Sequence, residues 1–116
     1  MKESGALMVA ALWLLFAAPI IQADTYHVPG DYGTIQEALS TAADGDTVLV
    51  ADGIYRGESN RNLSYRGRSI HLASENGPAC CIIDCEGQGP GVVFDWEEGK
   101  NAVLEGFTIR NGTADD

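Results

Sequence analysis

The chain has little positive charge. Its 116 residues include 7 lysines and arginines against 17 aspartates and glutamates, which gives a formal net charge of −10 at pH 7. An acidic protein repels the phosphate backbone of DNA and RNA, so we expect no nucleic-acid partner.

Residue types that carry metal and phosphate chemistry are also scarce. There are 2 histidines and 3 cysteines, and they do not form the cluster that a tetrahedral zinc site needs. The glycine-rich run at 87–91 lacks the lysine and the following helix of a phosphate-binding loop, and no nucleophile elbow is present. The residues themselves therefore indicate no cofactor.

The cysteines Cys80, Cys81 and Cys85 form an odd set. At least one of them stays free, pairs with another chain or pairs with a residue beyond this segment. In an extended segment, Cys81 and Cys85 lie about 13 Å apart at the usual rise of a strand, which is too far for a disulfide. We expect some of the three to act as small apolar fillers of the core.

The only long apolar run lies at the N-terminus. It extends from Ala6 to Ala18, follows Lys2, and leads to the small residue Ala23, which is the layout of a secretory signal peptide. The run is shorter than the roughly 20 apolar residues of a membrane span. We therefore expect residues 1–23 to be removed and the mature chain to be extracellular, at the cell surface or, in a bacterium, periplasmic, with no stable membrane span.

A pattern recurs at a fixed interval in the rest of the chain. Each copy has a turn glycine followed by two apolar residues, which lie on one face of a strand because strand side chains alternate. A fixed period with matching inward side chains predicts an all-β solenoid of about 22 residues per coil. The glycines are Gly45, Gly67 and Gly89, and the two apolar series are Val48, Ile70 and Val92, and Val50, Leu72 and Phe94.

One amphipathic helix is expected before the first coil. Thr34 and Glu37 form a capping box, and Asp44-Gly45 supplies a stop. We expect this helix to cover the apolar end of the solenoid. We therefore assign 24–45 to the N-terminal strand and capping helix and 46–116 to the first coils. A polar loop at 58–62 is expected to bulge outward. The apolar stripe of the helix comprises Ile35, Ala38, Leu39, Ala42 and Ala43.

Several phrases of the sequence resemble the N-terminal portion of secreted right-handed parallel β-helix proteins of the pectin-lyase-like superfamily. The resemblance extends from about Thr25 to Gly112 and is specific for the fold rather than for one activity. The phrases are Thr34-Ile-Gln-Glu-Ala-Leu, Gly45-Asp-Thr-Val-Leu-Val, Gly53-Ile-Tyr, Ile82-Ile-Asp and Leu104-Glu-Gly-Phe-Thr-Ile-Arg-Asn-Gly112.

The resemblance implies a module that engages polysaccharide, pectate-lyase-like or glycosidase-like in its full-length form. The alternative is a non-enzymatic, adhesin-like surface solenoid, and the sequence leaves open whether the protein is an enzyme. Members of the superfamily continue for many more coils, so we expect a fragment without the active coils, whose C-terminal edge is covered by further coils or another chain. Calcium is a candidate cofactor on the strength of the resemblance alone.

Two groups of carboxylates are candidates for catalysis, Asp84 with Glu86, and Asp95 with Glu97 or Glu98. Acid/base cleavage of a glycosidic bond needs two carboxylates, and calcium-assisted proton abstraction needs clustered carboxylates with a basic residue. Asp84 and Asp95 each follow an apolar strand and would project from the outer surface. Solvated turn chemistry is the favoured explanation of both groups, and no arginine or lysine is near them in the pattern, so the catalytic residues stay unknown.

The aromatic residues Trp96, Tyr55 and Tyr65 are candidates for a platform that binds sugar rings, with packing in the core or at a corner as the favoured explanation. His27 and His71 are interpreted as surface residues, because His71 alternates with the inward Ile70 and Leu72.

Asn62 and Asn111 match the acceptor pattern for N-glycosylation, which has meaning only in a eukaryotic source.

Overall fold

The computed structural model describes residues 22–94 and 101–113. The signal peptide predicted at 1–23 therefore lies outside the described residues except for its last two positions. The described residues form an all-β fold of parallel sheets with little helix. The elements are β1 (Thr25–Val28), α2 (Ile35–Thr41), β2 (Thr47–Val50), β3 (Gly53–Tyr55), the 3-10 helix η1 (Glu58–Asn60), β4 (Leu63–Ser64), β5 (His71–Ser74), β6 (Cys81–Asp84), β7 (Val92–Val93), β8 (Val103–Glu105) and β9 (Thr108–Arg110).

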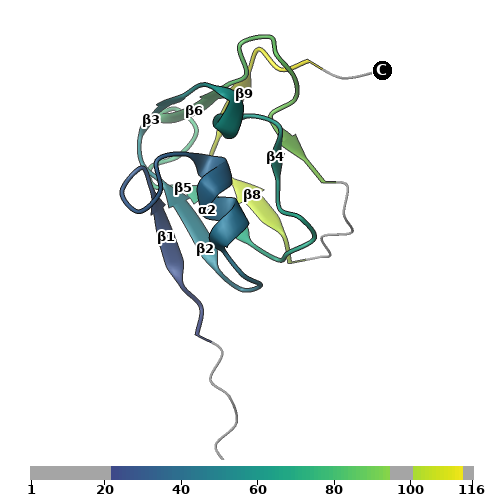
Figure 1. The fold of residues 1–116 in the computed structure, drawn as a ribbon. Coiled ribbons are helices and arrows are strands. Elements are labelled where there is room, and N and C mark those ends of the chain that lie inside the picture. Colours follow the sequence, from purple (N-terminus) through teal and green to yellow (C-terminus); the bar gives the residue numbers. More distant parts are fainter. Residues whose placement is uncertain (1–21, 95–100, 114–116) are drawn as a thin grey trace, which may run out of the picture.

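The strands form three sheets, and every pair of neighbours is parallel. Sheet A has the order β1-β2-β5-β8, sheet B has β3-β6-β9, and sheet C has β4-β7. After β1 and α2, the chain visits sheets A, B and C in that order twice and then returns to A and B. Each strand therefore pairs with its counterpart from the next pass, and the three sheets surround a common interior (Figure 1).

The register within these sheets corrects the predicted series of stacked side chains. Val48 lies opposite Leu72 rather than Ile70. Val92 belongs to sheet C, where it lies opposite Leu63. Neither Ile70 nor Val92 is therefore the strand partner that the repeat assigned to Val48.

The interval between paired positions is not constant either. Thr25 pairs with Thr47 between β1 and β2, which is the predicted interval. The interval is longer between β2 and β5, where Thr47 pairs with His71, and longer again between β5 and β8, where His71 pairs with Val103. Side-chain pairing sets the register while the connecting turns differ in length, so equal spacing does not identify equivalent positions.

The three turn glycines are evenly spaced in the sequence but likewise do not occupy equivalent positions in the fold. Gly45, Gly67 and Gly89 all have positive φ, at 91°, 79° and 139°, which only glycine adopts without cost. They do not occupy one corner, because the amide of Gly45 bonds the carbonyl of Ser69. Position 69, two residues after Gly67, is therefore the counterpart of Gly45.

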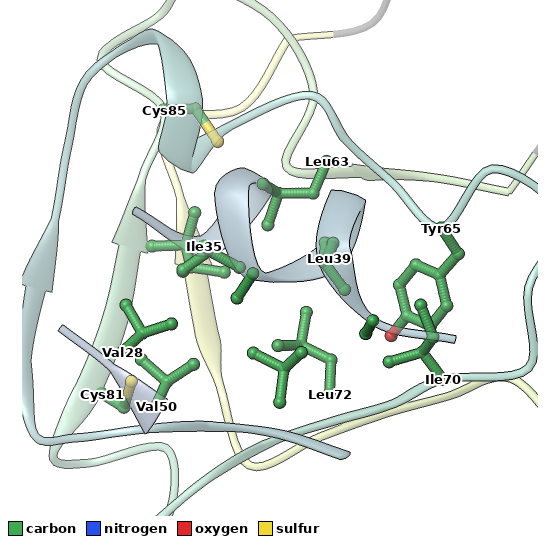
Figure 2. Packing of buried hydrophobic residues seen from close by; sticks show 14 residues of the cluster. Val28, Ile35, Leu39, Val50, Leu63, Tyr65, Ile70, Leu72, Cys81 and Cys85 are labelled. Carbon is green, nitrogen blue, oxygen red and sulfur yellow. The ribbon is translucent and has the colours of Figure 1, made fainter. Parts of the chain in front are cut away.

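The predicted inward residues do form most of the core. Val48, Val50, Ile70 and Leu72 are fully buried, whereas Phe94 is 51% exposed and Val92 is half-buried. The predicted burial of Phe94 is therefore wrong. Figure 2 shows that side chains of α2 and side chains of the sheets face one another and together fill the core.

The helix begins as predicted. The Thr34 hydroxyl accepts the amide of Glu37, and the Glu37 carboxylate accepts the amide of Thr34, which completes the capping box. The helix ends at Thr41, before the predicted Asp44-Gly45 stop, because the C-cap Ala42 is extended. Ala43 is consequently exposed rather than part of the buried stripe.

An arginine completes the C-terminal end of α2. Arg68 donates from Nη1 to the carbonyls of Ser40 at 3.1 Å and Ala42 at 2.5 Å. The last carbonyls of a helix have no partner within the helix, so this side chain supplies one. The helix contacts β1, β2, β4 and η1, and it lies across the interior between them (Figure 1).

The sequence predicted that the segment 58–62 bulges outward, but one of its side chains lies in the interior. The segment contains η1, and the side chain of Asn60 is buried. Asn60 Oδ1 accepts the amide of Ile35 at 2.8 Å, and its Nδ2 donates to the carbonyl of Arg56 at 2.8 Å. Asn60 thus fastens η1 to the first turn of α2. The short strand β4, which follows, has no counterpart in the predicted elements.

The thiols of Cys81 and Cys85 are buried, Cys80 is exposed, and all three are free. The prediction that some cysteines act as apolar fillers is confirmed by the two thiols in the core (Figure 2). Burial raises the pKa of the Cys81 thiol to about 11, and burial also raises the pKa of Cys85.

Candidate functional site

Asp84 lies at the centre of a polar cluster at the end of sheet B. Its Oδ2 accepts from Arg56 Nε at 3.2 Å and from Arg110 Nη2 at 3.3 Å. Its Oδ1 accepts from Asn111 Nδ2 at 2.9 Å and from the amide of Glu86 at 3.0 Å. The two arginines come from the passes before and after that of Asp84, so the cluster ties three passes together.

This environment prevents Asp84 from working as an acid. Its side chain is 8% exposed, and the hydrogen bonds from the Asn111 side chain and the Glu86 amide, together with Arg110, lower its pKa to about 2. The carboxylate is ionised at neutral pH and both of its oxygens already have partners. Asp84 still lies on the outer face of sheet B, as expected, because it alternates with the core residue Ile83. The arginines cover it, and it ends a strand, so the favoured explanation of a solvated turn residue is wrong.

The expectation that no basic residue lies near Asp84 is also wrong, because Arg56 and Arg110 contact it. They are 28 and 26 residues away in sequence, and only the register of sheet B brings them together.

The second carboxylate of this group is bound as well. Glu86 Oε1 accepts from the amide of Gly57 at 3.0 Å and from Arg61 Nη1 at 3.2 Å. Asp84 and Glu86 therefore serve as anchors between passes rather than as a catalytic pair. The other predicted group, Asp95 with Glu97 or Glu98, lies outside the described residues, as does Trp96.

A polar groove of about 660 Å³ lies beside this cluster, over β4. Residues from α2, η1, β4, β7 and the turns between them line it, and most of them carry hydrogen-bonding side chains. They are Gln36, Glu58, Ser59, Arg61, Asn62, Ser64, Arg66, Gln88 and Val93. Sequence reasoning missed this groove, because its walls come from segments far apart in the chain, and Asn62 is the one lining residue that a sequence motif indicates.

Hydrogen bonds hold one wall of the groove in place. Gln36 Oε1 accepts the amide of Ser64 at 2.9 Å, and Gln36 Nε2 donates to the Ser64 carbonyl at 3.2 Å. The Gln36 side chain thereby pairs with the backbone of β4 as a further strand would. This wall cannot rearrange without breaking both bonds.

Other side chains of the groove keep their hydrogen-bonding capacity. Within residues 22–94 and 101–113, the side chains of Asn62, Arg66 and Gln88 make no hydrogen bond or ion pair, and all three residues are exposed. Arg61, whose side chain is 17% exposed, is paired with Glu86. The groove therefore offers one unpaired guanidinium group and two unpaired amides.

Of the three aromatic candidates for a sugar platform, the two that the structure describes make packing contacts instead, as the favoured explanation predicted. Tyr65 is fully buried and its hydroxyl donates to the Val103 carbonyl, so it belongs to the core. Tyr55 packs locally, with its hydroxyl donating to the Ala51 carbonyl at 2.8 Å.

The histidines lie on the surface as predicted. His27 is exposed. The side chain of His71 points outward and is 42% exposed, but it is not isolated, since its Nε2 contacts Glu105 Oε1.

The two glycosylation candidates differ in their surroundings. Asn62 is exposed and lines the groove. Asn111 is exposed as a residue, but its Nδ2, the atom that would carry a glycan, donates to Asp84.

Metal and membrane features were searched in the described residues. They contain no group of three or more histidine, cysteine, aspartate or glutamate side chains arranged to hold a metal ion. None of their helices has the length and apolar character needed to cross a membrane.

The chain matches no protein-family profile, no curated protein and no solved structure.

Proposed function

We propose that this chain forms the first coils of a secreted, right-handed parallel β-helix of the pectin-lyase-like kind, and that it engages polysaccharide. The observation that carries the proposal is the order in which the chain visits its sheets. Parallel strands recur in the sequence A, B, C, and each pairs with its counterpart from the next pass. A β-solenoid requires this order, since each coil contacts only the coils next to it.

Two further features support the coil assignment. Connections between parallel strands of one sheet are right-handed in nearly all proteins, which favours a right-handed course here. The buried residues Ile35 and Leu39 of α2 cover the interior beside β1 and β2. A helix in this place shields the apolar cross-section of a first coil from water.

The groove over β4 supports an interaction with sugars. Its lining is rich in amide, hydroxyl and guanidinium groups, which can exchange hydrogen bonds with the hydroxyls of a sugar ring. We assign binding rather than catalysis to the described residues, because Asp84 and Glu86 are both held by arginines. Lyase or hydrolase chemistry in a full-length form would belong to other coils.

A non-enzymatic surface module is the second candidate. The pairing of Asp84 with Arg56 and Arg110 favours it, because a carboxylate in this environment stabilises the stack of strands and performs no chemistry.

The proposal can be tested with the full chain, expressed for export and purified from the secreted fraction. Binding to immobilised neutral and acidic polysaccharides is measured alongside release of unsaturated or reducing sugar ends. We expect Asp24 as the N-terminal residue and saturable binding to at least one polysaccharide without release of ends. The Val50→Asp variant, expected to be unfolded, controls for non-specific adsorption.

Each outcome of this experiment decides a part of the proposal. Retention of residues 1–23 would overturn the secretion assignment. Absence of binding to every polysaccharide would overturn the function. Release of sugar ends would overturn the assignment of binding alone and would make the chain itself an enzyme.

A further inference from the structure

We infer that the groove over β4 binds a single oxoanion group, a carboxylate, sulfate or phosphate, carried on a sugar ring. The sugar part of this inference rests on the proposed function. The anion part rests on the residues that line the groove.

Positive charge is concentrated near the groove in an otherwise acidic chain. Four of the 7 lysines and arginines lie within 56–68. Arg68 is engaged with carbonyls at the end of α2, and Arg56 is engaged with Asp84. Arg61 gives one nitrogen to Glu86. Within the described ranges, Arg66 is the member of this group whose side chain has neither a hydrogen bond nor an ion pair, and it lines the groove.

The backbone at Arg66 supports a role in binding. Arg66 has φ of 55°, in the left-handed region where glycine is the more stable residue. Its amide donates to Ser64 Oγ at 3.1 Å, which holds the turn in this conformation. A non-glycine residue in this region costs free energy, and such residues cluster at active and binding sites.

The neighbouring side chains fit an anion on a polar ring. A guanidinium group binds an oxoanion through two parallel hydrogen bonds. The unpaired amides of Asn62 and Gln88 also line the groove, and both can donate to ring hydroxyls or to the anion. The carboxylate of Glu58 lies in the same groove and repels anions, so it limits affinity and disfavours a second negative group.

Binding is measured by titrating the isotopically labelled full chain in nuclear magnetic resonance spectra. The ligands are methyl β-D-glucuronide, glucose 6-sulfate and glucose 6-phosphate, with neutral methyl β-D-glucoside and inorganic sulfate as comparisons. We expect at least one anionic sugar to shift the Arg66 side-chain signal and the amide signals of Asn62 and Gln88 in a saturable manner. The neutral glucoside and inorganic sulfate should each bind more weakly, and added salt should weaken the binding of the anionic sugar.

Matched variants test the assignment to Arg66. Arg66→Gln should weaken binding of the anionic sugar about 10-fold or more, as expected for loss of a charged hydrogen-bonding partner. Arg110→Gln makes the same change of charge outside the groove and should have little effect. Glu58→Gln should tighten binding, whereas Glu75→Gln, the same change at an exposed residue away from the groove, should not.

Arg66→Gly adds a readout that a purely structural role would not give. Because glycine relieves the left-handed backbone, this variant should melt at the same or a higher temperature than the parent chain while it loses binding. A lower melting temperature with unchanged binding would show that Arg66 serves the fold and would overturn the inference.

The inference also fails if the neutral glucoside binds as tightly as every anionic sugar, or if Arg66→Gln leaves binding unchanged. If polysaccharide binding persists without any preference for an anion, the inference fails while the proposed function stands. If the anionic sugars bind at Arg66 but no polysaccharide binds, the proposed function fails while the anion site stands.

Discussion

Alternating side chains in β2 divide its residues between the core and the outer face. Val48 and Val50 are fully buried, whereas Thr47 and Leu49 are only half-buried. This period of two follows from strand geometry. The loss of stability caused by a substitution therefore depends on whether the residue faces the core or the outer side.

Val50→Asp places a carboxylate without a partner in the core, which costs about 3–5 kcal/mol. The substitution also removes the burial of the valine side chain, about 1.5–3 kcal/mol, and the two losses together reach the lower end, about 5 kcal/mol, of the total stability of a small domain. Circular dichroism during thermal melting should show no cooperative transition. Leu49→Asp is the matched control and should keep the transition, and a cooperative melt of Val50→Asp like that of the parent would contradict the burial of Val50.

Asp84 should make stability depend on pH. Its pKa of about 2 lies below the value near 3.9 of an unfolded aspartate. Its stabilising contribution is therefore complete above the unfolded pKa and is lost as pH falls toward 2. Asp84→Asn should be less stable than the parent near pH 6, and the difference in free energy of unfolding should shrink between pH 5 and pH 2.

Urea denaturation at several pH values measures this difference. Glu75→Gln is the control, because the Glu75 side chain has no hydrogen bond or ion pair in the part of the chain that the structure describes, and its effect should be small at every pH. A gap between Asp84→Asn and the parent that stays constant down to pH 2 would contradict the assignment.

At the residue scale, the local pattern predicted burial in β2 and β5 but not at Phe94, and it did not predict which side chains pair. The inward positions of Val50 and Leu72 and the outward position of His71 follow from alternation within one strand. The arginine partners of Asp84 lie 28 and 26 residues away, on other passes, and no local pattern connects them. The favoured explanation of Tyr65, packing in the core, is confirmed, although the preceding strand β4 has only two residues, too few to reveal an alternation.

The two helices depend both on contacts between near neighbours in the sequence and on contacts between residues far apart in it. The start of α2 could be predicted from Thr34 and Glu37, because a capping box is contained in four consecutive residues. Its end could not, since Arg68, which caps the last carbonyls, is 26 residues beyond Ala42. The inward turn of η1 likewise depends on Asn60 reaching Ile35, 25 residues away.

Asn60→Ala should loosen the junction between α2 and η1. The substitution leaves the amide of Ile35 and the carbonyl of Arg56 without their partner, and a buried group that loses its hydrogen bond costs about 1–3 kcal/mol. Thermal melting should show a lower midpoint. Ser59→Ala, at the exposed neighbouring position, should leave the midpoint within a degree or two, and an equal effect of the two substitutions would contradict the role of Asn60.

Across the whole molecule, turns from successive passes contact one another closely. Ser74, the last residue of β5 before the β5–β6 turn, donates from Oγ to the carbonyl of Gly106 and accepts the amide of Gly77 at 3.0 Å. Gly106 has φ of 83°, and a Cβ added to it would overlap Ser74 Oγ. The two turns can stack in this way only because residue 106 has no side chain.

Gly106→Ala should therefore destabilise the fold by about 2 kcal/mol, through both backbone strain and the clash with Ser74. Gly45→Ala is a useful comparison, since Gly45 has φ of 91° but a Cβ added there would meet nothing within 4 Å, so it reports strain alone. Denaturant unfolding measures both. A smaller loss at Gly106 than at Gly45 would contradict close stacking of the turns.

The parallel all-β class could be predicted from the sequence, whereas the period could not. The interval between paired strands lengthens from the pair of Thr25 with Thr47 to the pair of His71 with Val103, because each turn has its own length while pairing aligns only the short strands. The regular spacing of the turn glycines thus indicated the correct class through an incorrect register. The groove over β4 could not be predicted for a related reason, since its walls come from segments that only folding brings together.

The buried thiols of Cys81 and Cys85 can report unfolding of the core, because they react only when they become exposed. A brief pulse of iodoacetamide should alkylate the native protein once, at exposed Cys80, because the two inner sulfurs are covered and Cys81, with a pKa of about 11, holds almost no thiolate at neutral pH. The denatured protein should take up three labels, counted by intact mass. Under oxidising conditions the same shielding protects Cys81 and Cys85 from mispairing once the core has closed, whereas Cys80 stays accessible.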